Sequence, residues 1–131
     1  MPKKISMAAA LGLASVMLAP ATATAMSLQF SWEGYARCTK GSPAFTLGDV
    51  PAGTTRLSFK LTDLKVPNYP HGGGTVAYQD GTTVIGAGAV SAQGPCPPEG
   101  ERHDYQWTVQ ALDGAGKVLA SASAVRKFPP R

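Results

Sequence analysis

The chain has 131 residues and a formal net charge of +4 at pH 7, with 12 Lys and Arg against 8 Asp and Glu. This length is enough for one core, and it excludes a two-domain enzyme with an interdomain cleft. The one notable basic cluster, Arg126, Lys127 and Arg131, is typical of a solvated tail, so we expect no nucleic-acid partner.

The first 25 residues are typical of a secretory signal peptide. Lys3 and Lys4 give a positive start, an apolar run spans 5–20, and Ala23-Thr24-Ala25 supplies the small residues that a signal peptidase requires. We therefore predict cleavage after about Ala25, a periplasmic or secreted location, and one domain over residues 26–131. The run is too short and too alanine-rich for a convincing membrane span, so we expect no stable membrane insertion; a retained anchor is the alternative.

Downstream of residue 25 the sequence predicts short β-strands. Of the chain's 15 glycines and 11 prolines, 14 and 9 lie here and interrupt any helical pattern, and apolar residues mostly recur at every second position. The predicted strands are 28–32, 55–63, 75–79, 82–85, 102–112 and 118–125. Asp80-Gly81 predicts a hairpin turn between the third and fourth strands, and 113–116 predicts a turn before the last. These elements favour a mostly β, antiparallel sandwich or barrel-like domain.

The two cysteines, Cys38 and Cys96, are expected to form a disulfide because paired thiols are usual in exported proteins. For a loop of this length the bridge would stabilise the fold by about 4 kcal/mol at most. Two free buried thiols, or two metal ligands, are the alternatives.

Two predicted strands carry polar residues at one end of an apolar face. Asp63 ends the first of these faces, and His103 and Tyr105 begin the second. If the two strands are antiparallel neighbours, a carboxylate, an imidazole and a phenol meet beside the stiff loop 94–98. Apolar walls with a few fixed polar groups are typical of a small-molecule pocket. The alternative is that Asp63 caps a loop and the two rings bond backbone carbonyl groups.

Three segments of the chain resemble motifs of one family. They are Ser42-Pro43-Ala44-Phe45 with Val50-Pro51-Ala52-Gly53-Thr54, then Thr62-Asp63-Leu64-Lys65-Val66-Pro67, then Gly94-Pro95-Cys96-Pro97-Pro98 with His103-Asp104-Tyr105. The sequence is similar to the phosphatidylethanolamine-binding proteins in their bacterial, Raf-kinase-inhibitor-like form. The resemblance implies an antiparallel β-sandwich-like fold with a small anion pocket at one sheet edge. The ligand-binding residues that it implies are Asp63, Gly94 through its backbone N–H, Pro95, Pro98, His103 and Tyr105.

The departures from this family also carry expectations. Lys65 stands where the family has a second Asp, and 74–78 lacks the family's His-Trp pair. His71 is the candidate to replace the missing pocket histidine, with an exposed loop histidine as the alternative. The family's C-terminal helix region is largely deleted here, with Gly114-Ala115-Gly116 in its place, so we expect a shallower pocket.

The sequence gives little support for catalysis. His71-Gly72-Gly73-Gly74 spells an oxyanion-hole motif, but the Gly-x-Ser-x-Gly elbow that must accompany it is missing. We expect no enzyme activity, no cofactor and no metal, with a zinc or copper site of Asp63, His71 and His103 as the alternative. The first interpretation is a binding protein for a small anion or phospholipid headgroup. The second is an exported interaction or inhibitor domain that uses the loops around the pocket, and the third is a purely structural domain.

Overall fold

The structure, a computed structural model, describes residues 2–4, 8–17 and 25–131. Most of the predicted cleavage site, Ala23 and Thr24, lies outside the described residues. Residues 2–4 and 8–17 contain no helix or strand, and their side chains are exposed. Within the described ranges, no helix is long and apolar enough to cross a membrane.

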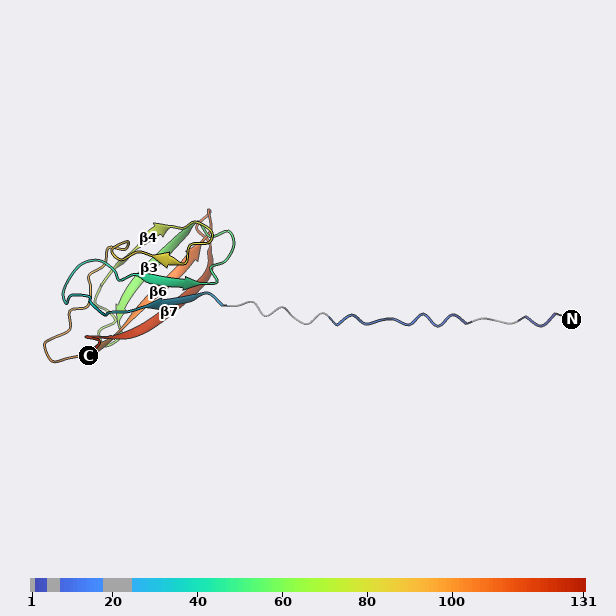
Figure 1. Ribbon diagram of the computed structural model, residues 1–131, viewed down its shortest axis with the longest axis horizontal. Helices are drawn as coiled ribbons and strands as arrows, with labels where there is room; N and C mark the ends of the chain where they lie inside the picture. Colours follow the sequence, from blue (N-terminus) through green and yellow to red (C-terminus); the bar gives the residue numbers. More distant parts are fainter. Residues whose placement is uncertain (1, 5–7, 18–24) are drawn as a thin grey trace.

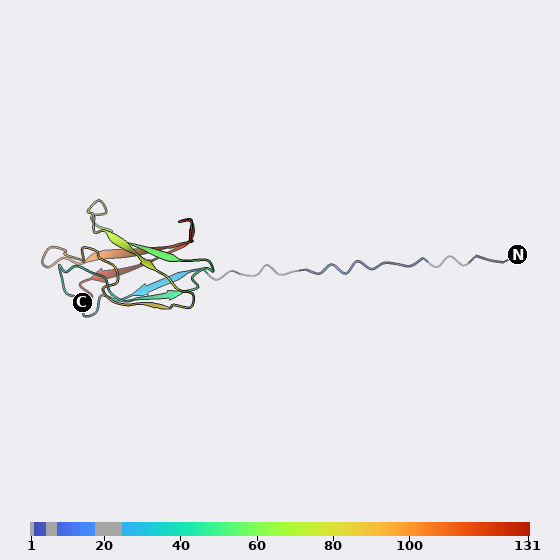
Figure 2. The same cartoon turned by 90° about the horizontal axis from the view of Figure 1, so that it is seen from above.

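Every regular element in residues 25–131 is a strand, and the strands form two antiparallel sheets (Figures 1 and 2). The smaller sheet has the order β1-β2-β5 and the larger has the order β4-β3-β6-β7. The strands are β1 (Ser27–Phe30), β2 (Phe45–Gly48), β3 (Arg56–Asp63), β4 (Gly73–Ala77), β5 (Val84–Ile85), β6 (His103–Leu112) and β7 (Val118–Phe128). Figure 2 shows the two sheets as stacked layers. The expected mostly β, antiparallel sandwich is therefore confirmed.

The core lies between the two sheets and is rich in aromatic rings. Burial alternates strictly along β3 and along most of β6, because successive side chains point to opposite faces of a strand. Phe45 of β2 is fully buried; it stacks on Phe59 with 4.6 Å between ring centroids and meets Trp107 edge-on at 5.0 Å. Such pairs add about 0.5–1.5 kcal/mol to the burial of the rings themselves. They join the smaller sheet to the larger one.

The strands β6 and β7 form a long hairpin, as the sequence predicts. The turn between them is held by Asp113, whose Oδ1 accepts hydrogen bonds from the backbone N–H groups of Ala115 (2.9 Å) and Lys117 (2.8 Å). The prediction that a short glycine-rich turn replaces a helix here is confirmed.

Two strand predictions are wrong. The four-residue strand β2 was not expected, because its sequence Phe-Thr-Leu-Gly is too short to establish a period. The 79–82 turn does form, with the Thr82 N–H donating to the Gln79 carbonyl at 3.1 Å. The flanking strands do not pair as a hairpin, however: β4 pairs with β3, and β5 pairs with β2 in the other sheet. A turn signal reverses the chain but does not decide which sheet the next strand joins.

The C-terminal segment is also more ordered than the sequence predicts. The exposed residues Arg126 and Lys127 belong to β7 rather than to a solvated tail, and Phe128 is buried. The first strand ends at Phe30, and Trp32 beyond it is buried with its indole N–H donating to the Arg126 carbonyl at 3.3 Å. These contacts join the end of β1, in the smaller sheet, to β7 in the larger sheet.

Candidate functional site

The antiparallel pairing of β3 and β6 brings the predicted polar residues together. Asp63, the last residue of β3, lies opposite Tyr105 in the register, and His103 is the first residue of β6. The expectation that these two strand ends meet is therefore confirmed; because β3 and β6 are the inner strands of the larger sheet, they meet at the end of its strands. The loop after β3 and the proline-rich loop before β6 leave the sheet at this same end.

Asp63 and His103 form a buried pair. His103 Nδ1 lies 2.7 Å from Asp63 Oδ2, and each residue is only 4 % exposed. The second oxygen, Asp63 Oδ1, accepts the backbone N–H of Lys65 at 2.9 Å. Burial alone would raise the pKa of Asp63, but the hydrogen bonds from His103 and Lys65 and the positive charge of His103 outweigh it and lower the pKa below its usual value. The carboxylate is thus fully engaged by the protein.

Tyr105 stands between the two histidines and is kept protonated. Burial first, and the negative charge of Asp63 second, raise the pKa of its phenol far above the usual value. Its ring is nearly parallel to that of His103, with 6.2 Å between centroids, and it meets the ring of His71 edge-on at 5.7 Å. A protonated phenol in this position is a hydrogen-bond donor.

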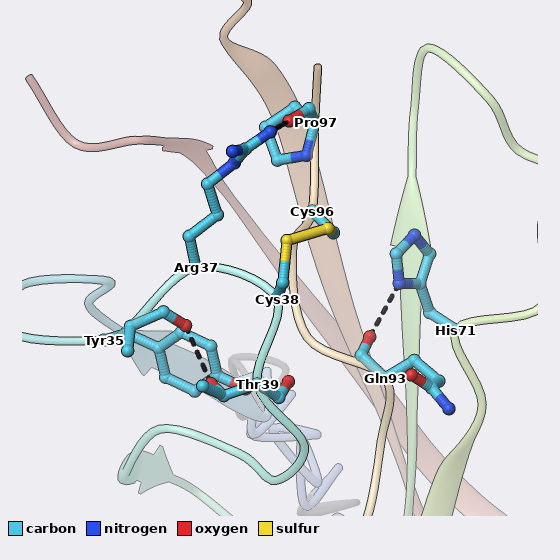
Figure 3. The surroundings of a disulfide bond; sticks show 9 residues. Tyr35, Arg37, Cys38, Thr39, His71, Gln93, Cys96 and Pro97 are labelled. Carbon is cyan, nitrogen blue, oxygen red and sulfur yellow. Dashed lines mark hydrogen bonds between the residues drawn. A yellow bond between two sulfur atoms is a disulfide. The ribbon is translucent and has the colours of Figure 1, made fainter. Parts of the chain in front are cut away.

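His71 is buried at the site rather than exposed on a loop. Its Nδ1 lies 2.6 Å from the backbone carbonyl oxygen of Gln93 (Figure 3). Because a carbonyl only accepts, Nδ1 carries a proton and Nε2 is left on the opposite side of the ring. Glycine follows where β4 approaches β3 closely, since a side chain at Gly73 would overlap the Phe59 carbonyl. The alternative of an exposed loop histidine is excluded.

The wall opposite the histidines is made by two chain segments joined by the disulfide. Cys38 and Cys96 are bridged, as predicted, with 4.5 Å between their Cα atoms. Beside the bridge, the Cys38 N–H donates to the Pro95 carbonyl at 2.9 Å. The Arg37 guanidinium donates to the Pro97 carbonyl (Figure 3). Segment 37–41 is therefore held along segment 92–97.

The residues of the proline-rich loop do not all face the cavity as expected. The Gly94 N–H is not offered to a ligand, because it donates to the Thr39 carbonyl at 2.8 Å. Pro95 is buried and does not line the cavity, whereas Pro98 does and Pro97, which was not predicted, joins it. Prolines have no N–H, so Pro95 and Pro97 bind segment 37–41 through their carbonyl groups, which accept from Cys38 and Arg37.

Together these elements enclose a cavity of about 290 Å³ at this end of the strands. Of the predicted ligand-binding residues, six line it: Asp63, His71, Gly94, Pro98, His103 and Tyr105. Both half-cystines also line it. Val66, Tyr69, Gln93 and Pro97 complete the lining. The sequence signal available for Val66 and Tyr69 was the presence of apolar side chains in the loop that follows the strand ending at Asp63.

An ion pair stands at the mouth of the cavity. Lys65 Nζ lies 2.6 Å from Glu101 Oε1, and the same oxygen lies 3.6 Å from Nε2 of His103. Lys65 is the main cause that holds the pKa of Glu101 below its usual value. In the described part of the chain, His103 Nε2 is buried without a hydrogen-bond partner.

The described residues contain no cluster of side chains suited to bind a metal ion. There, no three side chains of His, Cys, Asp or Glu are placed so that they could hold a metal ion. The alternative of a zinc or copper site of Asp63, His71 and His103 thus gains no support from the geometry.

No protein-family model matches the sequence, and no curated protein matches it. Among solved structures, the fold is similar to that of a phosphatidylethanolamine-binding protein homologue of Chlamydia trachomatis. The TM-score is 0.58 and the sequence identity 20 %, covering 79 % of this chain and 97 % of that chain. It is also similar to E. coli YbcL, described as a member of the mammalian phosphatidylethanolamine-binding protein family, with TM-score 0.47, 22 % identity, and 67 % and 79 % covered. The first likeness shows that this chain has the fold of the phosphatidylethanolamine-binding proteins, as the motif resemblance implied.

Proposed function

We propose that the protein is a non-catalytic binding protein for a small anion, such as the phosphate group of a free metabolite or of a phospholipid headgroup. The observation that carries the proposal is the set of three rings, His71, His103 and Tyr105, that converge on one cavity. Each ring is held in place by the protein. His103 is bonded to Asp63, and His71 to the Gln93 carbonyl. Tyr105 is buried between the two histidine rings.

The donors in this cavity suit phosphate oxygens. Imidazole N–H and phenol O–H groups donate hydrogen bonds, and such bonds to an anionic oxygen are stronger than those between neutral groups. Among the described residues, Asp63 is the only carboxylate that lines the cavity. Both of its oxygens are occupied by the protein, which lowers its repulsion of an anion. Arg37, which lies close enough to affect the pKa of Tyr105, adds positive charge on the far wall.

The size of the cavity limits the ligand. A volume of about 290 Å³ lies just below the range for small-molecule pockets, roughly 300–1,000 Å³. This favours a headgroup or a small phosphate ester over a whole lipid with its acyl chains. The name of the Chlamydia trachomatis protein refers to phosphatidylethanolamine, which makes phosphoethanolamine a natural probe.

The chemistry of the site favours binding over catalysis. A nucleophile needs an adjacent base that takes its proton. In the described residues, the hydroxyl side chains that line the cavity are those of Tyr69 and Tyr105, and the raised pKa of Tyr105 disfavours its phenolate. We therefore propose that the protein has no enzymatic activity of its own.

The test is an NMR titration of the protein with inorganic phosphate, acetate and phosphoethanolamine, following the ring protons of His103 and Tyr105. We expect saturable shifts for the two phosphate compounds that are lost in His103→Ala. Flat titrations of a well-folded protein would refute the proposal. A larger affinity for phosphoethanolamine than for phosphate would favour the headgroup over the free anion.

A second candidate function is that of an exported interaction or inhibitor domain, and one observation favours it. The loop after β3 exposes three large apolar side chains close together in sequence, Leu64, Val66 and Tyr69, which are 44 %, 46 % and 54 % exposed. Val66 and Tyr69 also line the cavity. This candidate predicts that Leu64→Ser and Tyr69→Ser abolish binding to a hydrolase partner while His103→Ala does not, as measured by inhibition of a panel of hydrolases.

We also propose that the chain is exported, with a signal peptide removed after about Ala25. The disulfide fits an oxidising compartment outside the cytoplasm. The mass of the protein recovered from periplasmic and culture fractions tests the position of cleavage.

A further inference from the structure

The strongest unassigned feature of the molecule is the ion pair at the cavity mouth. Lys65 lies in the loop after β3, and Glu101 lies two residues before His103 in the proline-rich loop. The pair therefore joins the two loops that border the cavity. Lys65 is 60 % exposed and Glu101 is 39 % exposed, so solvent competes for both charges and the pair can open without disturbing the core.

The carboxylate of Glu101 also faces the histidine. Its Oε1 lies 3.6 Å from Nε2 of His103, which is within the range of an ion pair but too long for a good hydrogen bond. That nitrogen is buried and, within the described residues, has no hydrogen-bond partner. The opposite nitrogen of the ring is committed to Asp63. The free position on His103 is thus one that an anionic oxygen would fill, and Glu101 only approaches it.

We propose that Glu101 is a built-in competitor for the anion that binds in this cavity. Its carboxylate pairs with the Lys65 ammonium and shields Nε2 of His103, so an incoming ligand must displace it to reach both nitrogens. This inference rests on the proposed function of the cavity as an anion site. It makes Lys65 and Glu101 specificity-determining residues: a ligand with two or more anionic oxygens replaces Glu101 at both nitrogens, while a neutral ligand does not.

The same loop offers a matched control. Glu99 lies two residues before Glu101, is exposed, and makes no ion pair in the described part of the structure. Glu99→Gln and Glu101→Gln each remove one negative charge from the same loop. A general change in the field at the cavity affects both variants, whereas the loss of a competitor affects only the second.

The experiment is a titration of wild type, Glu99→Gln and Glu101→Gln with inorganic phosphate, measured by NMR of the His103 ring and by calorimetry. We expect Glu101→Gln to bind phosphate at least about threefold more tightly than the other two, which is the order of effect of one exposed ion pair. We also expect the Nε2 signal of His103 to move in Glu101→Gln without ligand and to stay in place in Glu99→Gln. Glu101 is partly exposed, so the fold should tolerate the change.

The outcomes separate the two proposals. If wild type binds phosphate at His103 and Glu101→Gln binds it no more tightly, the competitor is refuted and the anion site stands. If both glutamine variants gain equally, the effect is general electrostatics and the competitor is again refuted. If phosphate leaves the His103 signals of all three proteins unchanged, the anion site fails, and the inference fails with it because an unshielded His103 in Glu101→Gln still takes no anion.

Discussion

Asp63 and His103 are joined across the ends of β3 and β6 by a hydrogen bond of 2.7 Å, and both are shielded from solvent. Their pairing depends on the register that sets Asp63 opposite Tyr105. It orients the imidazole so that one nitrogen is held by the protein and the other is turned toward the mouth of the cavity, where Glu101 lies. The Asp63–His103 pair therefore links the stability of these strand ends to the affinity of the cavity for anions.

Replacing Asp63 should affect both stability and binding. Asp63→Asn removes the charge that His103 faces, and breaking one side of a buried pair costs about 3 kcal/mol. We expect a drop of this order in the free energy of unfolding, measured by denaturant titration, together with loss of phosphate binding. The control is Asp104→Asn, which removes an exposed ion pair to Lys127 on the outer face of β6 and should cost no more than about 1 kcal/mol. Equal costs for the two variants would contradict the structural role of the buried pair.

The lowered pKa of Asp63 predicts a loss of stability in acid. The folded state holds this carboxylate more strongly ionised than the unfolded chain does, so the unfolded chain binds more protons at low pH. The stabilisation is present above the ordinary value of 3.8 and is lost as pH falls from there through the lower folded pKa. The free energy of unfolding of wild type and Asp63→Asn, measured across this range, should converge toward acid. A difference that does not change with pH would mean that the carboxylate is not held in its ionised form.

The raised pKa of Tyr105 predicts a loss of stability at high pH. The folded state keeps the phenol protonated while the unfolded chain releases the proton near its ordinary value of 10.0. This contribution to stability is present below that pH and is lost as pH rises above it. Ultraviolet titration of phenolate should show that one of the four tyrosines ionises later than the rest, and that Tyr105→Phe removes this late step. Persistence of the step in Tyr105→Phe would assign it to another tyrosine.

Reduction of the disulfide should loosen the cavity wall. Cys38 and Cys96 clip together segments 37–41 and 92–97, and in the loop-entropy model the bridge contributes at most about 4 kcal/mol. We expect the midpoint of denaturant unfolding to fall when reductant is added, and phosphate binding to weaken with it. The double variant Cys38→Ser, Cys96→Ser should unfold at the lower midpoint with or without reductant. A reductant effect in that variant would point to something other than the bridge.

The sequence predicts those elements of the fold whose pattern of apolar and polar residues is long enough to be recognised. The eight-residue and longer alternating strands, β3 and β6, show their period clearly, and the polar residues at their ends locate the site. By contrast, β2 and β5 have four and two residues, too few to show a period, and their pairing across the chain is decided by the core around Phe45. A local pattern also cannot reveal that the Gly94 N–H is already occupied by Thr39.

The contact between Lys65 and Glu101 illustrates the same limit. The two residues are 36 positions apart and belong to different loops, and each read alone looks like a solvated charge. Only the folded arrangement of the two loops brings them together above His103. The resemblance thus implied Lys65 at the pocket, whereas Glu101 and its ion pair with Lys65 were not predicted.

The close packing around Gly94 gives a last prediction. Because Gly94 has no positive φ, a substitution there tests steric overlap and not backbone strain. A Cβ at Gly94 would overlap the Tyr35 hydroxyl and the Thr39 carbonyl, which lie on the segment that the disulfide holds. Overpacking of this kind typically costs about 1–3 kcal/mol, so Gly94→Ala should lower the free energy of unfolding by that amount and displace segment 37–41. The matched control is Gly86→Ala: like Gly94 it has no positive φ, and open space surrounds it, so it should cost little. Equal stability of the two variants in denaturant titration would mean that the segment moves aside freely, and that the wall of the cavity is softer than its contacts indicate.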